Sequence, residues 1–129
     1  MSAQVSPLAR AARVDLQVEQ IASAGRWESG KATGGYRVLV VREGSEEVRR
    51  RAVLQWIQES AARGPDSLRY SLELTEQAGA YALSHPEIIR RGARWILRLK
   101  AASQPLASYD RSVEFELGPP GKVSLVRPP

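Results

Sequence analysis

The chain lacks cysteine altogether, and this absence removes several kinds of site. No disulfide, no thiolate metal centre and no cysteine nucleophile can form. Histidine is nearly as scarce, because His85 is the only one in 129 residues. A serine triad needs a histidine base, and Ser84 beside His85 does not supply its geometry, because neighbouring side chains of an extended chain diverge. We therefore expect no catalytic residues and no enzymatic activity.

Ligands for a metal ion or a cofactor are equally scarce. A single histidine, no cysteine and no closely spaced aspartates leave too few donors for a metal site. Gly34 and Gly35 precede an expected strand, so the helix N-terminus that cradles phosphates in nucleotide-binding loops is missing. We therefore expect neither a metal nor a cofactor.

Long apolar runs are absent as well. No stretch approaches the roughly 20 apolar residues of a membrane helix, and no basic segment followed by an apolar core opens the chain. We expect no membrane span and no secretory signal in this chain. The compartment stays open: cytoplasmic, or periplasmic or secreted if a signal peptide has been removed. The cysteine-free, loop-rich and basic composition fits a bacterial cell envelope.

Lysine is rare, whereas arginine is common. The lysines are Lys31, Lys100 and Lys122, in a chain with a net charge of +5 and a pI of about 10.1. A GC-rich genome, whose codons favour arginine, is the simpler explanation. A basic surface that collects nucleic acid or another polyanion is the alternative. The candidate contacts lie in two clusters: Arg49, Arg50 and Arg51, and Arg90, Arg91 and Arg94.

Period-two alternation of apolar and polar residues is the main pattern that the chain does have. Apolar residues alternate with basic ones over residues 94–101 and with acidic ones over 112–117. Gly118 to Gly121 then turns the chain into residues 122–126. Antiparallel, half-buried strands with a basic outer row beside an acidic one have this pattern. Further strands are expected at residues 13–21, 36–42 and 68–75.

Two segments fit either a helix or a strand. Residues 45–63 have helix end signals, Ser45 as N-cap and Gly64-Pro65 as stop, but their β-branched and aromatic content favours a strand. Residues 85–102 begin near a capping-box pattern, but Gly92 is costly inside a helix and suits a hairpin turn. We favour strands in both segments. An α+β fold with helices near residues 45–63 and 85–102 is the alternative.

Seven or eight strands separated by regularly spaced turn signals predict an all-β fold. The expected architecture is a two-sheet antiparallel sandwich, immunoglobulin-like in its general architecture. A chain of 129 residues is long enough for one domain. We place this globular β domain at residues 13–127, after a flexible N-terminal leader at residues 1–12.

The aromatic and acidic residues of the expected strands have simple interpretations. Trp56 and Trp95 belong to the inward-facing rows, whereas Trp27 lies in a glycine-rich segment, residues 24–35, that we expect to be a loop. Capping of the core is favoured for Trp27, and an exposed binding anchor is the alternative. Glu114 and Glu116 lie on an outward row and predict a charge ladder with the arginines of the neighbouring strand.

The function that these patterns favour is that of a non-catalytic binding or assembly module. An all-β domain without a catalytic constellation offers strand edges and loops as its working surfaces, with another protein as the expected partner. The alternative is a basic nucleic-acid or polyanion-binding domain that uses the arginine clusters. The sequence does not indicate an oligomeric state.

Overall fold

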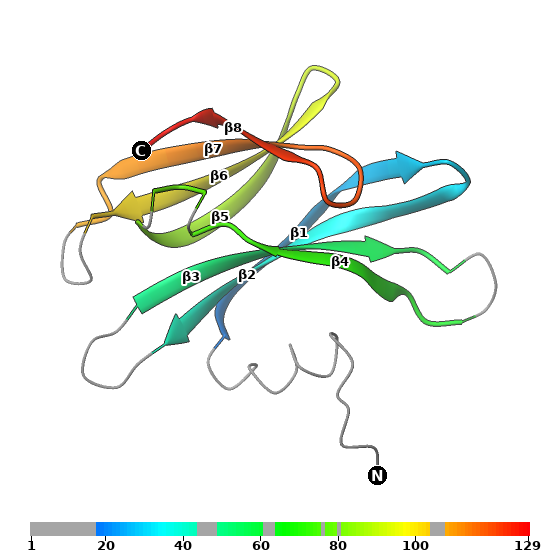
Figure 1. Cartoon of the computed structure of the whole chain (residues 1–129), viewed down its shortest axis with the longest axis horizontal. Coiled ribbons are helices and arrows are strands. Elements are labelled where there is room, and N and C mark those ends of the chain that lie inside the picture. The colour runs from blue at the N-terminus through cyan, green and yellow to red at the C-terminus, as the bar shows by residue number, and fades with distance from the viewer. Residues whose placement is uncertain (1–17, 44–48, 61–63, 76, 80, 104–107) are drawn as a thin grey trace, which may run out of the picture.

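The computed structural model describes residues 18–43, 49–60, 64–75, 77–79, 81–103 and 108–129. These residues form no helix and eight strands (Figure 1). The expected leader at residues 1–12 and the start of the expected strand at 13–21 lie outside the described residues. The strands are β1 (Val18–Ser29), β2 (Ala32–Glu43), β3 (Arg49–Gln58), β4 (Ser67–Glu73), β5 (Ala82–Arg91), β6 (Arg94–Ala102), β7 (Arg111–Leu117) and β8 (Val123–Arg127).

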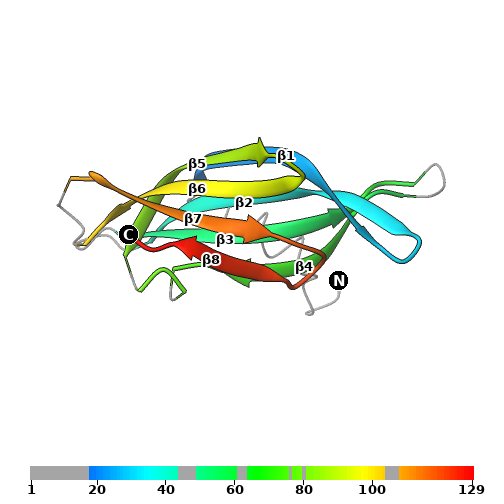
Figure 2. The same cartoon turned by 90° about the horizontal axis from the view of Figure 1, so that it is seen from above.

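The strands form two antiparallel sheets of four, in the orders β1-β2-β3-β4 (the first sheet) and β5-β6-β7-β8 (the second sheet). The predicted two-sheet sandwich is therefore confirmed. Figure 2 shows β1 and β5 together at one side of the sandwich and β4 and β8 together at the other. The likeness to immunoglobulin domains stops at the two-sheet architecture, because here the strands of each sheet lie in sequence order, whereas immunoglobulin domains have Greek-key connections.

Both segments that the sequence left ambiguous form strands, with no helix, in the part that the structure describes. β3 occupies the described middle of residues 45–63, and β5 and β6 occupy most of residues 85–102. Gly92 lies in the turn between β5 and β6 with a φ of 65°, which glycine adopts at little cost. The helical alternative is therefore wrong for these residues.

One apolar core fills the space between the sheets. The inward rows of β2 and β3 meet those of β6 and β7, as the period-two pattern of these strands requires. Trp95 packs against this core from a half-buried position, so it is less enclosed than the sequence suggested. The fully buried members are Val38, Val40, Ala52, Leu54, Trp56, Leu74, Leu83, Leu97, Leu99, Ala101, Val113 and Phe115.

The expected loop at residues 24–35 is instead a β-hairpin made by the end of β1 and the start of β2. Most glycines of this segment lie within its strands and not in its turn. Gly25 has a φ of 83° at an irregularity in the β1–β2 pairing, and Gly30 has a φ of 60° in the hairpin turn. Gly34 allows close approach, since a Cβ atom there would lie 1.8 Å from the carbonyl oxygen of Ile57.

Two polar contacts hold the sheets together around this core. The carbonyl oxygen of Gly118, just after β7, accepts hydrogen bonds from the indole nitrogen of Trp56 and the hydroxyl of Tyr36, both at 2.9 Å. Burial raises the pKa of Tyr36 to about 12, so its hydroxyl stays a donor at neutral pH. On the opposite side, the Gln20 side-chain oxygen of β1 accepts hydrogen bonds from the Ser84 hydroxyl and the His85 amide of β5.

Candidate functional site

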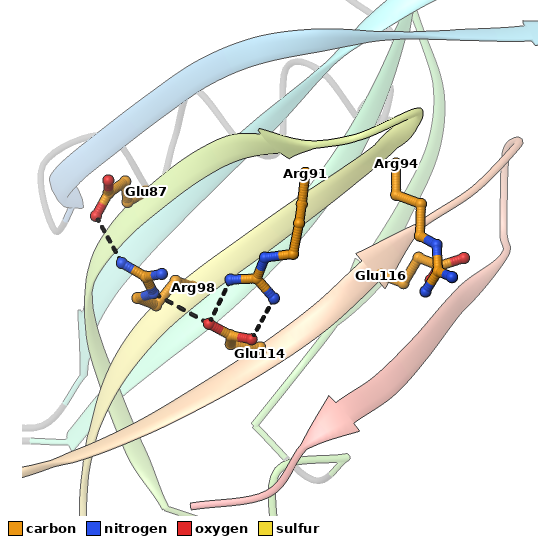
Figure 3. Close-up of polar contacts among 6 residues, drawn as sticks. All are labelled: Glu87, Arg91, Arg94, Arg98, Glu114 and Glu116. Atoms are coloured by element: carbon orange, nitrogen blue, oxygen red, sulfur yellow. Dashed lines mark hydrogen bonds and ion pairs between the residues drawn. The ribbon is translucent and has the colours of Figure 1, made fainter.

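The outer face of the second sheet carries a network of arginines and glutamates. Strand pairing places Glu87 opposite Arg98 and Arg98 opposite Glu114, so the three side chains form a row across β5, β6 and β7. Arg98 donates to Glu114 at 3.1 Å and lies 3.8 Å from Glu87. The predicted charge ladder between β6 and β7 is thus confirmed, and Figure 3 shows how its side chains converge.

Glu114 is the centre of the network. Arg91, at the end of β5, reaches over β6 and donates to both carboxylate oxygens of Glu114, at 2.9 and 3.2 Å. Together with Arg98 it leaves the residue only 4% exposed (Figure 3). The hydrogen bonds from Arg91, followed by those from Arg98, lower the pKa of Glu114 to about 2. Glu114 is therefore charged at neutral pH, and both of its oxygens already have partners.

A second, looser pair lies nearer the turn between β5 and β6. Arg94 donates to Glu116 at 3.2 Å, and its side chain is 68% exposed. Solvent and side-chain entropy make such a pair weak, on the order of 0.2–1 kcal/mol. Arg94 can therefore exchange Glu116 for another anion at small cost.

A groove of about 700 Å³ lies between this turn and β8. Ile96 lies in the groove and is only 2% exposed although it points to the outer face, and Val126 of β8 forms an apolar wall. The side chain of Arg127 forms no hydrogen bond or ion pair with any residue that the structure describes. The lining residues are Arg91, Gly92, Ala93, Arg94, Ile96, Glu114, Val126 and Arg127.

Strand β8, which borders this groove, is an edge of the second sheet. Among the strands that the structure describes it pairs with β7 alone, through a register that shifts between Glu114 and Phe115. Leu125 and Val126 are 42% and 45% exposed. Among the described residues no side-chain hydrogen bond or ion pair involves β8. This edge therefore combines unpaired backbone groups with exposed apolar side chains.

The first predicted arginine cluster does not form one surface. Arg50 donates to Glu19 at 2.9 Å and to the Tyr109 hydroxyl at 3.4 Å, and these hydrogen bonds raise the pKa of Arg50. Arg51 pairs with Glu73 of β4, and this contact lowers the pKa of Glu73. The backbone of Arg49 belongs to β3, but its side chain lies outside the described residues.

The second predicted cluster lies at the turn between β5 and β6, on a different sheet from the first cluster (Figure 1). Arg91 and Arg94 belong to the groove described above. Arg90 points elsewhere, with its guanidinium 5.6 Å from the centre of the Trp95 ring. The two clusters therefore do not combine into one basic strip.

Trp27 is part of the core. It is 3% exposed, and its indole nitrogen donates to the carbonyl oxygen of Gly35 at 3.0 Å. The favoured interpretation of Trp27 as a core residue is consistent with this position, and the exposed binding anchor is excluded. The residue is buried because the segment around it is a hairpin that packs over the end of the sandwich, not a loop.

Sequence reasoning missed Val126 and Arg127 as members of the site. Polar and apolar residues alternate over 122–125, just before these two residues, and that short pattern did not predict the register shift between β7 and β8. Their closeness to Arg94 depends on three strands lying side by side, and no local pattern encodes it. The available signal in the sequence was an arginine, Arg127, directly after the apolar residue Val126 at the end of an expected strand.

Other features do not add a chemical site. No group of three or more histidine, cysteine, aspartate or glutamate residues that could hold a metal ion occurs in the described residues. The part of the chain with a described structure has no helix long and apolar enough to cross a membrane. Comparison of the chain with protein-family models, with curated proteins and with solved structures finds no match.

Proposed function

We propose that the protein is a non-catalytic binding module that takes up an extended segment of another protein along the free edge of β8. The observation that supports this most is the exposure of Leu125 and Val126, at 42% and 45%, on a strand whose outer edge pairs with no strand that the structure describes. A segment added there would satisfy backbone donors and acceptors and would cover both apolar side chains.

The other edge strands are less suited to this role. β1 and β5 contact each other through Gln20, which accepts from Ser84 and His85. In β4, Arg69 donates to Gln58 and Glu73 pairs with Arg51, so both charged side chains of this strand already have partners within the first sheet. Tyr70 of β4 is 46% exposed, but its ring packs edge-on against Trp56.

The sequence around β8 also limits what can pair with it. Lys122 precedes the strand, and Pro128 follows it. A charged residue and a proline at the ends of an edge discourage open-ended sheet growth between copies of a protein. The five residues of β8 then accept a short extended segment of a partner.

Selection from a random peptide library displayed on phage tests this proposal. We expect selected peptides to change the amide NMR signals of residues 123–127 and to bind a Leu125→Ser/Val126→Ser variant at least about tenfold more weakly, because the apolar contacts are lost. Ile21→Ser is the matched control, since Ile21 is an apolar residue 60% exposed on β1.

Two results would contradict the proposal. One is a set of peptides that bind the β8 variant as tightly as the unchanged protein, and the other is a selection that yields no binder. The polyanion alternative predicts instead tight binding of duplex DNA with a steep salt dependence. The ion pairs of Arg50, Arg51 and Arg91 argue for the peptide, because they neutralise three of the six arginines in the two predicted clusters.

A further inference from the structure

We infer that the groove beside β8 selects an acidic partner segment, with carboxylates at alternate positions facing Arg94 and Arg127. This inference rests on the proposed function, because it names the chemistry of the segment that β8 would bind. The alternation follows from strand geometry, since every second side chain of an added strand would point to the outer face of the second sheet.

The first argument is the balance of charge inside the groove. Three arginines line it, Arg91, Arg94 and Arg127, against one carboxylate, Glu114. Glu114 cannot neutralise all three, because Arg91 and Arg98 already occupy its oxygens. The groove therefore has an excess of positive charge on the side that borders β8.

The second argument is that two of the arginines are available. Arg127 makes no side-chain hydrogen bond or ion pair within the described part of the chain. Arg94 has one contact at 3.2 Å to a glutamate that is itself 38% exposed. Carboxylates that reach these two guanidinium groups would form charge-assisted hydrogen bonds without breaking the network around Glu114.

The third argument concerns the apolar part of the groove. Ile96 and Val126 lie among the arginines, and Val126 is 45% exposed. A ligand that carries only charge would leave this apolar surface in water. A peptide with an apolar side chain beside its carboxylate would cover Val126 and pair with Arg127 at the same time.

A peptide fits this groove better than a nucleic acid does. Binding of single strands usually relies on exposed aromatic rings that stack on bases. The nearest such ring, Trp95, is half buried and has the guanidinium of Arg90 over it.

A synthetic peptide of about seven residues, long enough to cover β8, tests the inference. Its sequence alternates valine with glutamate, and its ends are blocked. A control peptide has glutamine in place of every glutamate. Fluorescence anisotropy measures the affinity of both for the unchanged protein, for Arg94→Gln/Arg127→Gln and for Lys31→Gln/Arg69→Gln. The last variant loses the same charge at exposed positions in the first sheet.

We expect the glutamate peptide to bind about fivefold more weakly to Arg94→Gln/Arg127→Gln than to the unchanged protein, because the variant loses two exposed ion pairs with the peptide. The control variant should bind it nearly as the unchanged protein does, and the glutamine peptide should not distinguish the variants. Higher salt should weaken the binding of the glutamate peptide and leave the glutamine peptide largely unaffected.

Each other outcome has a distinct meaning. If the glutamine peptide binds as tightly as the glutamate peptide and changes the amide signals of 123–127, the acidic preference is wrong while the role of β8 stands. If neither peptide binds, or neither changes those signals, both proposals are wrong. Tighter binding of a single-stranded DNA, lost in Arg94→Gln/Arg127→Gln, would assign the groove to nucleic acid and overturn the inference.

Discussion

At the scale of single residues, Glu114 shows how an outward-facing carboxylate becomes buried in a small sandwich. The residue lies on the outer face of β7, yet Arg91 and Arg98 cover it and satisfy both of its oxygens. Period-two alternation correctly predicted its outward face and its place beside the arginines of the neighbouring strand, one of which is Arg98. It did not predict the burial, because Arg91 comes from β5, which is not adjacent to β7 in the sheet.

Replacing Glu114 by glutamine should make stability less dependent on pH. The pKa of Glu114 is about 2 in the folded protein, below its ordinary value of 4.5, so its charge stabilises the fold above pH 4.5 and is lost between about pH 4.5 and 2. The shift corresponds to about 3 kcal/mol, which we reduce to about 2 kcal/mol because the Arg91 side chain is 52% exposed.

Urea unfolding at pH 7 and at pH 2.5 measures this effect. We expect Glu114→Gln to lower the free energy of unfolding by about 2 kcal/mol at pH 7 and by clearly less at pH 2.5. Glu116→Gln is the matched control, since its single pair with exposed Arg94 predicts a loss under about 1 kcal/mol. An equal loss at both pH values would show that packing, not charge, explains the role of Glu114.

At the scale of elements, the hairpin of β1 and β2 depends on Gly34. A Cβ atom at this position would lie 1.8 Å from the carbonyl oxygen of Ile57 and 2.7 Å from the ring of Trp27. Gly34→Ala should therefore push β2 and β3 apart and lower the free energy of unfolding by about 3 kcal/mol, which thermal unfolding followed by circular dichroism can measure.

Gly30 in the turn of the same hairpin provides the control. A Cβ atom there would meet nothing within 4 Å, so only the positive φ of 60° opposes a side chain. Gly30→Ala should cost roughly 1–2 kcal/mol, the strain of alanine in the left-handed region. Equal effects of the two substitutions would mean that the close approach at Gly34 does not limit the pairing of β2 and β3.

The same hairpin explains why part of the fold could not be predicted from the sequence. Four glycines between residues 24 and 35 indicated a loop, because glycine most often marks turns. Only one of them, Gly30, is in the turn, while Gly34 and Gly35 lie in β2. Close approach to a neighbouring strand needs glycine as much as a turn does, and the sequence alone does not separate the two causes.

At the scale of the whole molecule, the sequence predicts which side chains of a strand face the core. It does not predict the order of the strands or which elements lie on the same face of a sheet. The alternation over 94–101 and 112–117 was enough to predict the pairing of β6 with β7. The groove forms because the turn before β6 and the edge strand β8 border the same face of the second sheet. This arrangement is a consequence of the strand order. Strand order depends on contacts between segments that are distant in sequence.

Because the core contains residues of both sheets, we expect the two sheets to unfold together. Leu54 lies in the first sheet and Leu97 in the second, and both are completely buried in the same cluster. Leu54→Ala and Leu97→Ala should each lower the free energy of unfolding by about 2–5 kcal/mol. Ile21→Ala, at an exposed position of β1, should change it by no more than about 0.5 kcal/mol.

Urea unfolding followed by two signals tests whether the sheets form one cooperative unit. Far-UV circular dichroism, which should show a β spectrum, reports on all strands, while tryptophan fluorescence reports on Trp27 and Trp56 in the first sheet and on Trp95 in the second. The two curves should coincide in the unchanged protein and in both leucine variants, because neither sheet has a core of its own. Separate transitions, with Leu97→Ala shifting only one of them, would show that the second sheet is stable without the first.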